Sequence, residues 1–86
     1  MDNRVGVVGI VVEDRETAAE EINQILSQSA SLIRGRMGIP FSEQDISTMA
    51  LIVEGTSDQI SALTGKLGNV EGVSLKSALT PYTREK

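Results

Sequence analysis

Two stretches of the chain carry apolar, mostly β-branched residues at successive positions, and they limit the possible folds more than any other feature. They run over residues 4–12 (RVGVVGIVV) and 46–54 (ISTMALIVE). Side chains alternate between the two faces of a strand, so apolar residues at both parities predict a strand that is covered on both faces. We therefore expect these two stretches to form the central strands of a sheet.

Residues 32–39 and 73–79 instead alternate between apolar and polar side chains, as half-buried strands do. In the first of them, the predicted core parity holds Ile33, Met37 and Ile39, and the outer parity holds Arg34 and Arg36. This pattern favours the two edge positions of the sheet.

Two helices are predicted between these strands. Residues 15–28 place apolar side chains at helical spacing, and Asp14 is suited to cap the helix start. A second helix is predicted to follow a cap at Ser57 and to stop at Gly68 and Asn69. The order strand, helix, strand, strand, helix, strand predicts an α+β, ferredoxin-like βαββαβ sandwich: a four-stranded antiparallel sheet with both helices on one face. We assign residues 1–80 to this single domain and expect residues 81–86 to form a flexible C-terminal tail.

Two helices can cover only one face of such a sheet, so the other face is expected to expose apolar side chains. The predicted interface residues on that face are Val5, Val7, Val11, Ile46, Ala50 and Ile52, with Arg34, Arg36, Ser74 and Lys76 beside them. An apolar patch with a polar rim is typical of subunit interfaces. We therefore expect a homo-oligomer, either a dimer or a tetramer. The alternative is a monomer with an exposed apolar face.

The composition argues against several classes of function. The chain has no histidine and no cysteine, which removes the commonest metal ligands and the usual catalytic bases and thiolates, so we expect no enzyme activity, no metal and no cofactor. Its net charge of −4, with eight lysines and arginines, argues against direct nucleic-acid binding. No apolar stretch approaches the roughly 20 residues of a membrane-spanning helix, and no signal segment is evident, so we expect no membrane and a cytoplasmic protein.

Two charged clusters remain open to more than one interpretation. Residues 13–21 hold five carboxylates, which could bind a hard cation, although a capped helix start followed by a solvated helix face is the reading we favour. Arg34 and Arg36 could hold an anion, or they could serve as charges that keep an edge strand from aggregating.

Several short motifs, taken together, carry a family resemblance. They are Val12-Glu13-Asp14-Arg15-Glu16, Asn23, Arg36-x-Gly38-x-Pro40, Ile60-x-Ala62-Leu63-x-Gly65-Lys66-Leu67-Gly68 and Gly72-Val73-x-x-Lys76. With them the chain resembles the regulators of the iron-only hydrogenase system over nearly its whole length. The resemblance implies an ACT-like ferredoxin fold, related to the regulatory domain of the nickel-responsive repressor. The chain lacks the histidines and cysteines of that repressor and a ribbon-helix-helix segment before the first strand, so we expect neither nickel sensing nor operator binding of that kind.

ACT-like domains often bind small molecules where the loop after the first strand meets a neighbouring subunit. By that likeness, the predicted ligand-binding residues are Glu13, Asp14, Arg15, Arg34 and Arg36. The resemblance therefore implies a regulatory or sensor module that oligomerises through its sheet, binds a small-molecule effector at the subunit interface and is linked to the iron-only hydrogenase system. The alternative is an oligomerisation or protein-interaction module without a ligand.

Overall fold

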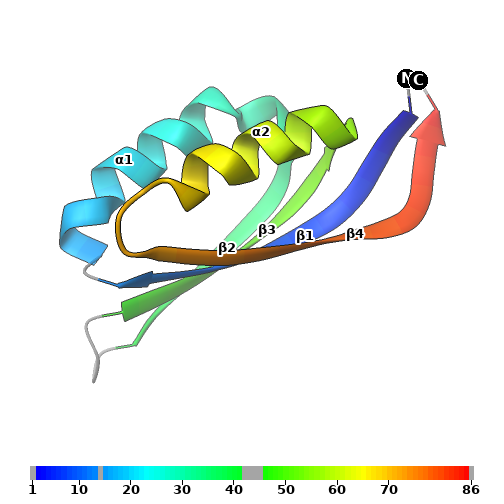
Figure 1. The fold of residues 1–86 in the computed structure, drawn as a ribbon. Coiled ribbons are helices and arrows are strands. Elements are labelled where there is room, and N and C mark those ends of the chain that lie inside the picture. The colour runs from blue at the N-terminus through cyan, green and yellow to red at the C-terminus, as the bar shows by residue number, and fades with distance from the viewer. Residues whose placement is uncertain (1, 14, 42–45, 86) are drawn as a thin grey trace.

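The computed structural model describes residues 2–13, 15–41 and 46–85 (Figure 1). Its elements, in chain order, are β1 (Asp2–Glu13), α1 (Arg15–Gln28), the 3-10 helix η1 (Ala30–Leu32), β2 (Ile33–Phe41), β3 (Ile46–Gly55), α2 (Ser57–Gly68) and β4 (Val73–Glu85). This order confirms the predicted βαββαβ arrangement, and α1 has the predicted bounds.

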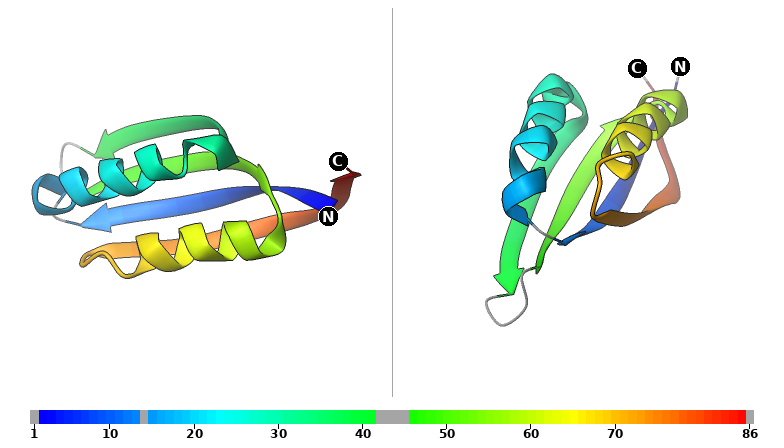
Figure 2. Two further views of the ribbon diagram at one scale, coloured as in Figure 1. Left: turned by 90° about the horizontal axis from the view of Figure 1, so that it is seen from above. Right: turned by 60° about the vertical axis from the view of Figure 1, so that its left-hand side comes forward.

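The four strands form one antiparallel sheet in the order β2-β3-β1-β4. The two strands that are apolar at both parities, β1 and β3, occupy the centre, as predicted. Both helices lie on the same face of the sheet (Figure 1). Seen from above, α1 lies over the half of the sheet that contains β2 and β3, and α2 lies over β4 (Figure 2).

The core lies between the helices and one face of β1 and β3, and its side chains are aliphatic. The buried residues are Val8, Ile10 and Val12 from β1, Leu51 and Val53 from β3, Ala18, Ile22, Ile25 and Leu26 from α1, Ile60, Leu63 and Leu67 from α2, and Val70. Val8 pairs with Leu51 across the two strands, so one parity of each strand forms a continuous apolar layer. We call the opposite side of the sheet, which bears no helix, the open face.

Thr56, and not Ser57 as predicted, caps α2. The Gln59 backbone N–H donates to Thr56 Oγ1 at 3.1 Å, and the Thr56 backbone N–H donates to Gln59 Oε1 at 2.9 Å. This reciprocal pair satisfies two backbone donors at the helix start. The predicted stop is confirmed, because α2 ends at Gly68 with Asn69 as its C-cap. The predicted cap at Asp14 falls outside the described residues.

Strand β4 continues through residues 81–85, where the sequence predicted a tail. Glu85 lies opposite Asp2 and Arg84 opposite Asn3, so this part of β4 pairs with the first residues of β1 beyond the helix layer (Figure 1). The β1–β4 pairing is irregular between Arg4 and Gly6, where β4 holds the extra residues and Thr80 Oγ1 donates to the Val5 carbonyl at 2.9 Å. The strand is extended here by backbone pairing, and the sequence carries no sign of it because such pairing requires no hydrophobic pattern.

A β-bulge in β2 corrects the predicted facing of that strand. Ile33 lies opposite Val53, but Gly35 lies opposite Ile52, so Arg34 is an extra residue in the ladder. The bulge reverses the alternation after residue 34. Met37 and Ile39, predicted to face the core, therefore lie on the open face, where they are 64% and 52% exposed.

Candidate functional site

The exposed apolar side chains gather on the open face. Among the described residues, seven large apolar side chains are exposed, and all but Tyr82 occupy open-face positions of β1, β2 and β3. These six are Val7, Val11, Met37, Ile39, Phe41 and Ile52. The register brings them together, because Val7 pairs with Ile52, while Met37 and Ile39 on β2 flank the same face of β3.

The six predicted interface residues occupy open-face positions in this register. Val7 and Val11 on β1 and Ala50 and Ile52 on β3 are exposed, and the two terminal members, Val5 and Ile46, are half-buried. Sequence reasoning missed the β2 contribution of Met37, Ile39 and Phe41. The alternation of that strand was visible, but the bulge that turns it over was not.

The middle of the open face is recessed, because the small residues Gly9 and Ala50 occupy it. Gly9 lies between Ala50 on β3 and Lys76 on β4, and a Cβ added at Gly9 would come no closer than 4.0 Å to the Lys76 carbonyl oxygen. A shallow hollow of about 290 Å³ lies beside Gly9 and extends over β4 as far as Ser74. An approaching surface could thus contact the backbone of the central strand.

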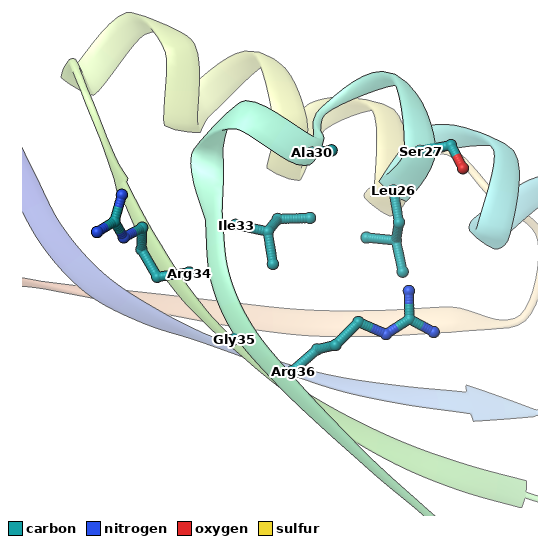
Figure 3. A pocket seen from close by; sticks show the side chains of 7 residues that line it. All are labelled: Leu26, Ser27, Ala30, Ile33, Arg34, Gly35 and Arg36. Atoms are coloured by element: carbon teal, nitrogen blue, oxygen red, sulfur yellow. The ribbon is translucent and has the colours of Figure 1, made fainter.

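A second feature lies on the helix side of the sheet, at its β2 edge. An open groove of about 370 Å³ separates the last turn of α1 and the helix η1 from the start of β2 (Figure 3). Its lining residues are Leu26, Ser27, Ala30, Ile33, Arg34, Gly35 and Arg36. We call it the β2 groove.

The two arginines of the β2 groove are directed away from each other (Figure 3). Arg34 points out of the groove, and its Nε lies 3.8 Å from Oε1 of Glu54, a carboxylate that is only 8% exposed. Arg36 lies opposite Leu51, whose side chain is in the core, so Arg36 projects to the helix side and extends beneath Leu26. Arg36 forms no hydrogen bond or ion pair within the part of the chain that the structure describes.

Among the predicted ligand residues whose side chains the structure describes, Glu13 lies far from Arg34 and Arg36 within one chain. Glu13 ends β1, whereas Arg36 lies in the row of Leu51 and Val8. That row is five residues back from Glu13 along β1, which is about 17 Å along the strand at 3.4 Å per residue. Asp14 lies outside the described residues, and of Arg15 only the backbone, at the start of α1, is described. The prediction missed Ser27 and the apolar residues around it, which approach Arg36 only because α1 ends above the β2 edge.

Glu13 also has a structural role at its own end of the sheet. Its backbone N–H donates to the Gly72 carbonyl at 2.8 Å, which ties the loop after α2 to the end of β1. Within residues 2–13, 15–41 and 46–85, no group of three or more acidic side chains is arranged to hold a metal ion. No helix in these ranges is long and apolar enough to cross a membrane.

Comparison with known proteins identifies close similarity to one family. A family model described as TM1266-like, iron-only hydrogenase system regulator, matches residues 4–77. The structure of TM1266 from Thermotoga maritima is 36% identical in sequence and superposes with a TM-score of 0.86, covering 90% of this chain and 96% of that one. A search of curated protein sequences finds no match.

Two more distant structures share the fold. The ACT domain of the GTP pyrophosphokinase of Chlorobium tepidum is 24% identical, with a TM-score of 0.74 over 91% of this chain and 100% of that one. CPII, a nitrogen regulatory PII-like protein from Thiomonas intermedia K12, is 11% identical, with a TM-score of 0.50 over 92% of each chain. The first of these likenesses confirms the predicted ACT-like, ferredoxin-like fold.

Proposed function

The chain belongs to the TM1266-like family of iron-only hydrogenase system regulators, and from this premise we propose that it is a non-enzymatic regulatory module that self-associates through the open face and responds to a small effector. The regulatory role comes from the family. The mode of association and the existence of an effector are our inference from the geometry of the sheet and of the β2 groove.

The open face is the observation that carries the proposal. Six large apolar side chains share it, while the small residues Gly9 and Ala50 leave its centre low. Removing apolar surface from water contributes roughly 25 cal/mol per Å², so a second copy that covers this face gains stability from every side chain on it. An 86-residue chain has a thin core, so the apolar area buried by association would also add to the stability of the folded chain.

The structural neighbours support an effector. The CPII structure was determined with ADP, AMP and bicarbonate bound, which is an example of a regulatory protein of similar fold that holds small molecules. The rows of the sheet that hold the predicted ligand residues Glu13 and Arg36 are about 17 Å apart along the strands, so these two residues could share one small ligand only across a subunit boundary.

A protein-interaction module without a ligand is the second candidate function. The observation that favours it is the breadth of the open face, which is a nearly continuous surface over β1, β2 and β3 and not an enclosed pocket. A different protein with an apolar face of similar size could cover it.

Light scattering of the purified chain and of two matched variants tests the self-association. Ile52→Lys puts a charge in the middle of the open face, where Ile52 is 43% exposed, and Ala62→Lys puts the same charge on the exposed side of α2. Burying an unpaired ammonium is costly, so Ile52→Lys should be monomeric and folded by circular dichroism, whereas Ala62→Lys should retain the wild-type mass. Equal masses for the two variants would refute association through this face.

A further inference from the structure

We propose that the β2 groove is a binding site for a short aliphatic carboxylate, with the guanidinium of Arg36 as the partner of the carboxylate group. The proposal deepens the proposed regulatory function by naming the chemical class of the effector. It rests on that function only in one respect, which is that the bound acid acts as a regulatory signal. Binding of the acid itself requires only the folded chain.

The shape and lining of the β2 groove set the size and polarity of its ligand. Its volume of about 370 Å³ lies near the lower end of the range for small-molecule sites. Leu26, Ala30 and Ile33 supply apolar walls, and the Ser27 hydroxyl is the polar group on the helical side (Figure 3). A few carbons with one polar end fit such a site better than a fully polar ion does.

The charge of the groove selects an anion. Its charged lining residues are Arg34 and Arg36, and none of the lining residues in the described part of the chain is acidic. Arg34 is already paired with Glu54, but Arg36 has no partner within the described residues and extends along the floor of the groove (Figure 3). A guanidinium offers two parallel N–H donors that match the two oxygens of a carboxylate.

The β-bulge explains why Arg36 lies in the groove. In a regular strand, Arg36 would face the same side as Arg34, but the extra residue turns it toward the helices. A structural role for Arg36 competes with the ligand role. The last turn of α1 has no basic residue, so Arg36 could serve only to offset the negative end of that helix dipole. A lysine at residue 36 could do the same, whereas it could not make the bidentate contact.

The lining also argues against a nucleotide as the ligand. None of the described residues that line the groove is aromatic, so they offer a purine base nothing to stack against. A short branched acid would instead bury its methyl groups against Leu26 and Ile33. The test therefore uses 3-methylbutanoate as its probe, with 3-methylbutanamide as a neutral compound of the same shape, inorganic phosphate as a compact anion and ADP as a nucleotide.

Titration of the ¹⁵N-labelled full chain, followed by the amide resonances, is the measurement. With 3-methylbutanoate we expect saturable shifts at Ser27, Ala30 and Gly35 and none at Gly9, which lies on the open face. The amide, phosphate and ADP should each bind at least about tenfold more weakly, because each lacks either the charge or the fit to the apolar walls. No saturable shift with millimolar acid, or equal binding of phosphate or ADP, would overturn the ligand class.

Three variants test the role of Arg36. Arg36→Lys and Arg36→Gln should both weaken binding of 3-methylbutanoate about tenfold or more, while Lys66→Gln, which removes an exposed cation on α2 away from the groove, should leave it within about twofold. Arg36→Lys should also keep the wild-type melting temperature without ligand. Unchanged affinity in Arg36→Lys would show that Arg36 serves only to offset the helix dipole. An equal loss of affinity in Lys66→Gln would overturn the assignment of the site to Arg36.

The Ile52→Lys variant separates this proposal from the proposed function. The groove and Ile52 lie on opposite sides of the sheet, so the variant should bind 3-methylbutanoate with the wild-type affinity whatever its mass is. Loss of binding in that variant, with its fold intact, would overturn a site contained in one chain.

Discussion

Arg34 and Arg36 stand two positions apart on β2, yet their guanidinium groups point away from each other (Figure 3). Arg34 reaches the buried carboxylate of Glu54, and Arg36 extends beneath the last turn of α1. The bulge at Arg34 produces this separation and has two consequences. It adds Met37 and Ile39 to the open face, and it places in the β2 groove the guanidinium of Arg36, which has no partner among the residues that the structure describes.

Gly6→Ala should destabilise the chain, because β4 leaves no space for a methyl group at this position. A Cβ at Gly6 would lie 2.6 Å from the Ala78 carbonyl oxygen and 2.5 Å from Leu79 Cδ2. Overpacking of this kind costs about 1–3 kcal/mol, and the backbone contact cannot relax by a rotamer change. Urea denaturation should show this loss for Gly6→Ala and less than about 1 kcal/mol for Gly9→Ala on the same strand. Similar losses for both would contradict the described β1–β4 packing.

Gly72→Ala should also lower the free energy of unfolding, for a different reason. Gly72 has a φ of +86°, and a Cβ there would lie 2.7 Å from the Glu13 carbonyl oxygen. The left-handed conformation alone costs an alanine about 1–2 kcal/mol. Gly68→Ala is the matched control, since a Cβ at Gly68 meets nothing within 4 Å, and thermal unfolding should show it to be neutral or stabilising. A melting temperature for Gly72→Ala equal to that of the wild type would be inconsistent with this loop geometry.

Thr56→Ala should cost about 1 kcal/mol, because it removes the acceptor of the capping box. Ser57→Ala, at the neighbouring residue that the sequence predicted as the cap, should change stability by less than about 0.5 kcal/mol. Chemical denaturation of the two variants side by side measures the difference. The reverse ranking would assign the cap to Ser57.

The sequence predicted the fold well where a hydrophobic pattern reports burial directly. Val8 and Leu51 belong to strands that are apolar at both parities, and this alone placed both strands at the centre of the sheet. The bounds of α1 followed from its apolar stripe. The facing of β2 was wrong because one extra residue at Arg34 reverses every side chain after it. Gly35, an isolated glycine inside the strand pattern, is the one signal of a bulge in the sequence, and it does not by itself fix the register. Residues 81–85 pair through their backbones, which residue identity does not reveal.

The candidate site was predictable in part for the same reasons. The open-face positions of β1 and β3, such as Val7 and Ile52, followed from alternation because those strands pair with each other in one unbroken register. The β2 groove depends on where α1 ends relative to β2, which is a tertiary relationship. Glu13 and Arg36 were grouped by family likeness, and the register separates them along the sheet.

Light scattering of the unmodified chain over a range of micromolar concentrations measures its mass in solution and is the sharpest test of self-association through the open face. The open face, with Met37, Ile39 and Ile52 exposed on one surface, predicts a particle of two or four times the 9.2 kDa of a single chain. A particle of 9.2 kDa at every concentration would contradict self-association through the sheet.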